Sequence, residues 1–154
     1  MVPGRTLHTS RMAFAEQEDL TFPDSTCFGC SPSHPIGLRL RFRREGDAIV
    51  TRTTVDDRFH GAPGIVHGGI VATLLDEVSC AAIFFSREQM VVTGELTVRY
   101  ARPCPTDVPL EVSARITRET SRYLVVDGAI RRDGVELARS QGKFFPQKRR
   151  ESAP

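Results

Sequence analysis

The sequence predicts an α+β domain in which an antiparallel sheet curls around one long helix. Residues 66–85 are apolar on nearly all sides of a helical projection, which is typical of a buried helix. Segments with strand-like patterns precede and follow this helix, and short turns join the strands that follow it. A long helix that must be hidden, beside strands joined by hairpins, indicates that the sheet wraps around the helix.

The N-terminal part of the chain is expected to be irregular up to residue 36. A short helix around residues 10–19 is its one candidate for regular structure, and turns rich in proline and cysteine follow. From Gly37 onward, leucine and phenylalanine alternate with arginine, which predicts a half-buried strand over residues 38–43. A Glu-Gly-Asp turn separates it from a second expected strand over residues 48–55.

Four more strands are expected after the helix. They cover residues 90–101, 108–117, 122–131 and 136–145. An Asp-Gly pair between the last two is a hairpin signal. The expected domain organisation is an irregular extension over residues 1–36, a folded domain over residues 37–146, and a flexible charged tail over residues 147–154.

Length and composition argue against several classes of protein. The chain has 154 residues, the size of one domain, with 40% hydrophobic and 26% charged residues, unlike fibrous or wholly disordered chains. A net charge of +2 without a basic stripe argues against a nucleic-acid partner. No uninterrupted apolar stretch reaches the roughly 20 residues of a membrane span, and the N-terminus lacks a secretory leader. We therefore expect a cytoplasmic protein without a membrane partner.

The four cysteines include one pair, Cys27 and Cys30, at the spacing of a zinc knuckle or a redox motif. A closed zinc site needs four ligands, and the sequence has no second pair to complete one. A loop rather than a helix follows the pair, which argues against a thioredoxin-like motif. We therefore expect a tight turn with reduced thiols, no metal and no cofactor; a zinc ion bridged between subunits is the alternative.

The start and the middle of the predicted helix carry the residues that indicate chemistry. Gly68 and Gly69 leave backbone N–H groups unshielded at the helix N-terminus, where the helix dipole favours a developing oxyanion. Asp76 and Glu77 are the only charged residues within 66–85. Desolvation and mutual repulsion are expected to raise the pKa of a carboxyl here, which suits a base or nucleophile. The alternatives are a simple N-terminal turn and a buried structural ion pair.

The spacing of these groups favours a dimer. Asp76 follows Gly68 by eight residues, which places them roughly 12 Å apart along a helix axis at 1.5 Å per residue. A carbonyl held at the helix N-terminus is therefore out of reach of Asp76 in the same chain. An antiparallel partner helix would bring its own Asp76 there, so a two-fold dimer with shared sites is expected.

Three stretches of the sequence carry a family resemblance. They are Val66-His67-Gly68-Gly69 at the helix start, Thr73-Leu74-Leu75-Asp76 within the helix, and residues 96–103 after it. Together they resemble hotdog-fold thioesterases of the PaaI-like, phenylacetate-pathway branch, whose strand order matches across residues 38–145. The Cys-Phe-Gly-Cys opening is similar to that of a subgroup of this branch. The resemblance implies a hotdog fold, an acyl-CoA substrate, and a homodimer that can pair into a tetramer.

The resemblance also implies catalytic roles for four residues. The Gly68 N–H would polarise the thioester carbonyl, and Asp76 of the opposite subunit would act as general base or nucleophile. Thr93 would help to position the water. His67 would orient the carbonyl or the helix start.

Four further residues are expected to contact the substrate: Gly69, His60, Glu77 and Arg102. His60 occupies a position where many members carry Asn or Gln, so it is the candidate substitute for positioning water. Glu77 lies about 100° round the helix from Asp76, so at most one of them faces a given site, and Asp76 is preferred. Arg102, like Lys143 and the tail arginines, is a candidate for contact with the phosphates of CoA.

Two other functions fit the sequence. A hotdog domain can bind acyl-CoA without hydrolysing it, since glycines and a carboxylate serve binding as well. A dehydratase or hydratase of the same fold would carry its acid at a shorter spacing from a loop histidine. That position is Leu74 here, whereas the acid is Asp76. The sequence does not identify the acyl group or distinguish CoA from a carrier protein.

Overall fold

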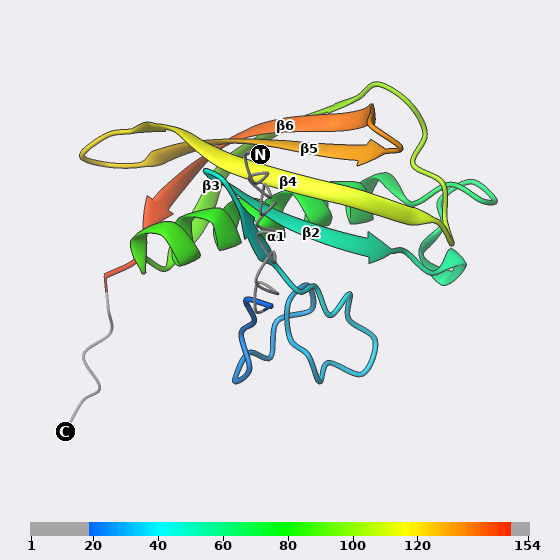
Figure 1. The fold of residues 1–154 in the computed structure, drawn as a ribbon, viewed down its shortest axis with the longest axis horizontal. Coiled ribbons are helices and arrows are strands. Elements are labelled where there is room, and N and C mark those ends of the chain that lie inside the picture. The colour runs from blue at the N-terminus through cyan, green and yellow to red at the C-terminus, as the bar shows by residue number, and fades with distance from the viewer. Residues whose placement is uncertain (1–18, 149–154) are drawn as a thin grey trace, which may run out of the picture.

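A computed structural model describes residues 19–148, which form one six-stranded antiparallel sheet and one long helix (Figure 1). In chain order the elements are β1 (Arg43–Glu45), β2 (Ala48–Thr54), the 3-10 turn η1 (Asp57–Phe59), α1 (Gly68–Arg87), β3 (Val91–Tyr100), β4 (Pro109–Glu119), β5 (Leu124–Arg132) and β6 (Val135–Pro146). Neighbouring strands follow the order β1-β2-β4-β5-β6-β3, so β3 lies at an edge. The predicted α+β fold, with a sheet around one central helix, is confirmed.

The core lies between α1 and the face of the sheet that curls around it. Alternation along the strands places every second side chain on this face. The buried apolar side chains of α1 are Val71, Leu74, Leu75, Val78, Ala81, Ala82 and Ile83, and those of the sheet include Ile49, Leu110, Val112, Val126, Ile130 and Phe144. The helix thereby packs against five strands, β2 to β6, which makes it a rigid support for side chains on its remaining faces.

The expectation that no segment is long enough to cross a membrane needs a correction. By length and composition alone α1 meets that criterion, with a mean hydropathy of 1.6 over its best window. The buried core helix of a globular protein meets it as well, and α1 packs along the sheet in that way.

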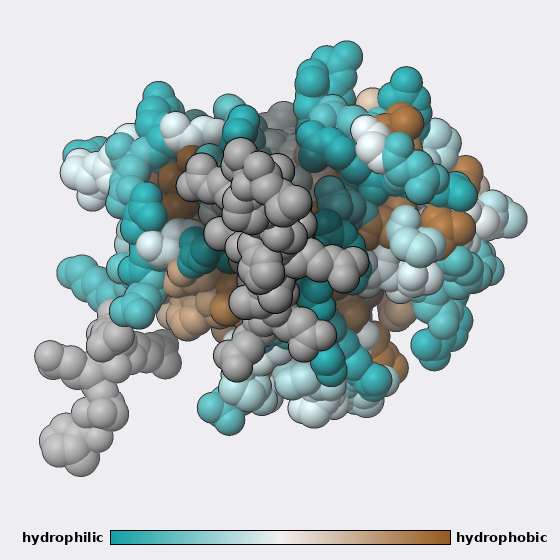
Figure 2. Space-filling model, viewed as in Figure 1, coloured by the Kyte–Doolittle hydropathy of each residue, from teal (hydrophilic) through white to brown (hydrophobic). Residues whose placement is uncertain are grey.

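Residues 19–42 cover the side of α1 that faces away from β4–β6 (Figure 1). Leu20 pairs with Phe42 through two backbone hydrogen bonds, and the ring of Phe22 lies 4.9 Å from those of Phe84 and Phe85. Phe85 at the end of α1 therefore packs against the core, and Phe84 contacts Phe22 and Phe85 beside it. Hydrophilic side chains cover most of the face shown in Figure 2, with small apolar patches between them.

The first predicted strand is largely wrong. Leu40 and Phe42 are buried as their alternation predicts, but only Arg43–Glu45 join the sheet. Arg39 has a φ of 51°, a left-handed conformation that interrupts an extended strand. The alternation predicted which residues are buried, but not that they form a strand. An irregular segment anchored at both ends can also bury every second residue.

The other predicted elements are confirmed with small shifts at their ends. The helix begins at Gly68 rather than at residue 66, because His67 caps it. β5 begins at Leu124 rather than at residue 122, because the N–H groups of Arg122 and Tyr123 bind the Thr120 hydroxyl in a turn. The expected short helix over residues 10–19 lies almost wholly outside the described residues.

Candidate functional site

The N-terminus of α1 offers one free backbone donor. The His67 ring accepts the Gly69 N–H through Nδ1 at 2.9 Å, and the His67 carbonyl accepts the N–H groups of Ile70 and Val71. Within residues 19–148 the Gly68 N–H has no hydrogen-bond partner, and Gly68 is exposed. Gly68 is therefore available to a ligand, whereas Gly69, also expected to contact the substrate, has its N–H occupied.

The loop that enters α1 is held by backbone hydrogen bonds. The His67 N–H donates to the Phe59 carbonyl, and the Val66 N–H donates to the Cys104 carbonyl. His60 lies in this loop, where its ring Nδ1 bonds the Asp57 carbonyl and lies 3.5 Å from the Asp57 carboxylate. The ring of His60, a predicted substrate contact, is thus engaged by Asp57 on the loop.

Tyr100, at the end of β3, packs over the helix start. Its hydroxyl donates to the Gly68 carbonyl at 2.8 Å, although the residue is half exposed. This contact fixes the first turn of α1 against the edge strand. Tyr100 was not among the expected site residues, although it lies in the stretch 96–103 that carries the family resemblance.

The structure brings Asp76 and Thr93 together. The Thr93 hydroxyl donates to Asp76 Oδ1 at 2.6 Å, from β3 to the middle of α1. A β-bulge between Thr93 and Glu95 interrupts the β3–β6 ladder at this point, and bulges commonly re-aim side chains beside functional sites. Gly94 sits in the bulge, where a Cβ would lie 2.2 Å from the Phe145 ring, so a larger residue would have to displace that ring.

The Glu77 side chain points away from the Asp76–Thr93 pair. Its Oε1 accepts a hydrogen bond from the Cys27 thiol at 3.2 Å, beneath the loop of residues 27–30. Burial raises the pKa of the Glu77 carboxyl, the hydrogen bonds from Cys27 and Cys30 oppose this shift, and the charge of Asp76 adds to it. The predicted rise in a carboxyl pKa thus holds for Glu77. The structure does not bring Glu77, expected as a substrate contact, to the Asp76–Thr93 pair.

Asp76 and the Gly68 N–H remain apart within one chain. Both lie on the same unbroken helix, so the separation of roughly 12 Å follows from its rise per residue. Gly69, Thr73, Asp76 and Cys80 form a stripe along the partly exposed face of α1 next to β3. This stripe carries one carboxylate and leads to the free donor at the helix start.

The residues expected to contact the phosphates of CoA lie in different surroundings. Arg102 follows β3 directly and donates to the Glu136 carbonyl at 3.0 Å, two residues beyond Tyr100. Lys143 pairs with Glu95 at 3.2 Å. The tail arginines lie outside the described residues. Of the residues expected to contact phosphates, Arg102 is the one closest in sequence to Tyr100, which contacts the start of α1.

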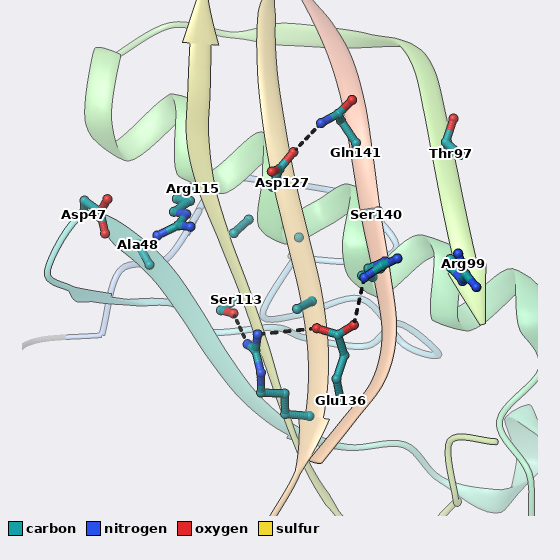
Figure 3. Close-up of a pocket in the computed structure, with 15 residues that line it drawn as sticks. Asp47, Ala48, Thr97, Arg99, Ser113, Arg115, Asp127, Glu136, Ser140 and Gln141 are labelled. Atoms are coloured by element: carbon teal, nitrogen blue, oxygen red, sulfur yellow. Dashed lines mark hydrogen bonds and ion pairs between the residues drawn. The ribbon is translucent and has the colours of Figure 1, made fainter. Parts of the chain in front are cut away.

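A hollow of about 690 Å³ lies on the face of the sheet opposite α1 (Figure 3). Several of its polar groups are paired: the Gln141 amide donates to Asp127 at 2.9 Å, and Arg131 lies 3.6 Å from Glu136. Neither Gly68, Asp76 nor Thr93 lines it. This hollow is therefore separate from the candidate site.

Comparison with known proteins identifies the family. A family model of the thioesterase superfamily matches residues 63–138, which contain α1, β3, β4 and β5. The chain belongs to the thioesterase superfamily. The acyl-coenzyme A thioesterase THEM4 of Rattus norvegicus is 34% identical to this superfamily member over 70 residues, 46% of this chain and 30% of THEM4.

Solved thioesterase structures share the fold. The crystal structure of a thioesterase superfamily protein aligns with a TM-score of 0.73 and 27% identity, over 79% of this chain and 60% of that one. A hypothetical thioesterase of Streptococcus pneumoniae TIGR4, solved with coenzyme A, aligns with a TM-score of 0.66 and 20% identity over 73% of this chain and 91% of that one. The chain thus spans less than two thirds of THEM4 and of the thioesterase superfamily protein with the TM-score of 0.73. The expected hotdog fold is confirmed.

Proposed function

We propose that this thioesterase-superfamily chain hydrolyses an acyl-CoA thioester to the free acid and CoA. The observation that carries the proposal is the free Gly68 N–H at the start of the helix whose middle holds the Asp76–Thr93 pair. The relative THEM4 bears the name of an acyl-coenzyme A thioesterase, and a structural relative was solved with coenzyme A. Both names support CoA as the thiol.

The two groups suit the two needs of the reaction. The thioester carbonyl would accept the Gly68 N–H, and the helix dipole would stabilise the negative charge that develops on its oxygen. Asp76 would take a proton from water as the water attacks the carbonyl carbon, or would attack that carbon itself. The Thr93 hydroxyl occupies Oδ1 and leaves Oδ2 for the reaction. The C–S bond then breaks, and CoA would leave as a thiol with the proton that Asp76 took from water. On the nucleophilic route CoA would take its proton from solvent, and water would then hydrolyse the acyl-Asp76 anhydride to the free acid.

The reaction needs Gly68 and Asp76 from different subunits. Within residues 19–148, β3 has a strand neighbour on one side only, so a second copy could extend the sheet along its other edge. Met90, Val92 and Tyr100 are exposed apolar residues on or beside this edge. Two-fold pairing at this edge runs the two α1 helices antiparallel. Each Asp76 would then approach the Gly68 of its partner, with Arg102 near the rim for the phosphates of CoA.

The first test measures the release of free thiol from short, long and aromatic acyl-CoAs. We expect the parent to turn over at least one class and Asp76→Ala to lose at least about 10²-fold, the scale of a general base. Asp24→Ala, which removes an exposed carboxylate that is distant from Asp76 in the sequence, should behave as the parent. Binding of acyl-CoA without thiol release would instead indicate a binding module, and turnover that survives Asp76→Ala would contradict the site.

The Gly68 N–H, the proposed oxyanion donor, can be removed with little other change to the structure. Proline is well tolerated at the first helical position, where Gly68 stands, and His67 already has the extended ψ of 135° that a following proline requires. We expect Gly68→Pro to lower kcat about 10²–10³-fold with little loss of stability. Gly68→Ala keeps the N–H, and its Cβ would contact Tyr100 at ordinary distances of 3.6 Å or more, so it should stay close to the parent.

Mixed subunits test whether the site is shared. In a hybrid of Gly68→Pro and Asp76→Ala chains, one site contains both substitutions and the other contains neither. If the sites are shared, random mixing of the two inactive variants should restore about a quarter of the parental activity. If each chain holds a whole site, mixing restores nothing.

A further inference from the structure

The pair Cys27 and Cys30 has a third partner that lies far away in the sequence. The two Sγ atoms and a carboxylate oxygen of Glu77 all lie within 4.8 Å of one another, and Cys27 Sγ is 3.2 Å from Glu77 Oε1. Tetrahedral zinc, with Zn–S bonds of roughly 2.3 Å, holds two sulfur ligands about 3.8 Å apart. The three side chains therefore need only a small contraction to share one ion.

The loop that carries the cysteines is fixed in position. Its backbone bonds the following segment twice: the Leu38 N–H donates to the Phe28 carbonyl, and the Leu40 N–H donates to the Gly29 carbonyl. The Gly29 N–H points to Cys27 Sγ at 3.3 Å, a donor suited to a thiolate. Such anchoring reduces the loss of conformational entropy when the ligands close on an ion.

Gly29 presses directly on the Glu77 side chain. A Cβ at this position would lie 2.3 Å from the Glu77 carboxyl carbon, so any larger residue would have to displace the Glu77 side chain. The contact holds the carboxylate of α1 against the two thiols.

The cluster contains negative charge without a positive partner. Glu77 is partly buried, and among the ion pairs of residues 19–148 none includes Glu77. Its side-chain hydrogen-bond partners there are thiols. A carboxylate that is partly withdrawn from water and has no cation beside it is destabilised, and a divalent ion would compensate its charge.

We propose that Cys27, Cys30 and Glu77 bind a thiophilic divalent transition metal of the Zn²⁺ class, with a water molecule in the fourth position. Two thiolates and one carboxylate are ligands that zinc accepts, and an oxygen-only cation such as Mg²⁺ would disfavour the sulfurs. On binding, the ion displaces the two thiol protons to solvent. The bound metal ties residues 19–42 to the middle of α1.

The proposed metal site is distinct from the proposed reaction. Glu77 and Asp76 are neighbours but point about 100° apart around α1, and the thiols lie over Glu77 rather than beside Thr93. Metal content and cobalt spectra therefore test this site whether or not thioesters are hydrolysed.

The experiment measures metal binding by the full chain under reducing conditions. The purified parent should contain about one zinc per chain. After removal of zinc, Co²⁺ should give the near-ultraviolet thiolate-to-metal charge-transfer band and the visible bands of a tetrahedral ion. Cys27→Ser/Cys30→Ser should lose these bands. Cys104→Ser, which changes a buried thiol (3% exposed) elsewhere, should keep them.

Glu77→Gln separates a metal site from a simple thiol–carboxylate contact. With a metal, the variant should bind Co²⁺ at least about tenfold more weakly, and a chelator should lower the Tm of the zinc-loaded parent more than that of the variant. A parent that binds no Co²⁺, or cobalt bands unchanged in the double cysteine variant, would overturn the proposal. So would a mass lower by two hydrogens per chain with no metal bound, because the pair would then be a disulfide.

Discussion

Two adjacent carboxylates of α1 have different surroundings, and this difference decides their chemistry. Asp76 accepts one hydroxyl hydrogen bond, from Thr93, on the partly exposed stripe beside β3. Glu77 meets thiols beneath a loop. A rotation of about 100° per residue is enough to direct neighbouring side chains of one helix to different parts of the fold. A single helix can therefore hold a reaction site and a second site at consecutive positions.

Thr93 offers a test at the scale of one hydrogen bond. Thr93→Val removes the donor to Asp76 Oδ1 at nearly constant volume, so the carboxylate loses part of its orientation. Because a hydrogen bond to a charged group contributes about 1.5–3 kcal/mol, we expect kcat for thioester hydrolysis to fall roughly tenfold or more.

Thr93→Ser is the matched control, since it keeps the hydroxyl and should retain most of the parental kcat. The Tm of both variants should stay close to the parent, because Thr93 is exposed. Equal kcat in the valine variant would show that the Thr93 hydroxyl does not support Asp76.

Single residues were predictable where their signal was local. Gly68 and Asp76 stand out in one helix, because glycine and charge are rare among its apolar residues. The contact of Cys27 with Glu77 spans 50 residues, and that of Tyr100 with Gly68 spans 32. Such pairs depend on how the chain folds back, which spacing within a single segment does not reveal.

At the scale of elements, the start of α1 depends on an unusual cap. The His67 ring replaces the more common Ser, Thr, Asp or Asn side chain in accepting the Gly69 N–H. His67→Ala should therefore lower the free energy of unfolding by about 1 kcal/mol, which corresponds to a Tm lower by about 2–4 °C. Thermal unfolding followed by circular dichroism measures this change.

His67→Asn distinguishes capping from a direct part in the reaction. Asparagine is a good cap, so it should restore the Tm. If His67 acts through the helix start, His67→Asn also restores kcat/KM. A restored Tm with lost activity would give the imidazole a role toward the substrate.

The predicted strands were correct where two strands pair over many residues. β4, β5 and β6 form long antiparallel ladders, and their alternation agreed with the sheet. Residues 38–42 show the same alternation, but their backbone bonds go to the loop around Gly29 and to Leu20. A pattern of burial does not specify which partner satisfies the backbone, so this segment was predicted as a strand.

At the scale of the whole molecule, the free β3 edge predicts a dimer. Light scattering should give twice the chain mass of 17.1 kDa, or a multiple of the dimer. Val92→Lys replaces an exposed apolar side chain on this edge with a charged one, which disfavours edge-to-edge pairing, and should shift the mean mass toward the monomer. Val135→Lys is the control, because Val135 has the same exposed fraction of 47% but lies at the β5–β6 turn.

A monomer at all concentrations for the parent, or an equal effect of both lysine variants, would contradict pairing at β3. It would also leave the hybrid experiment without a physical basis, because no partner would supply Asp76.

The position of β3 in the sheet also sets the timing of assembly during translation. Thr93 and Tyr100 lie on β3, whose one strand neighbour in the described residues is β6, the last strand in chain order. A nascent chain therefore leaves β3 without its strand neighbour on the ribosome until residues 135–146 emerge. Such late, non-local pairing slows folding and leaves the strand edge open to chaperones. A stop codon before β6 would thus remove the support of both residues along with the last strand.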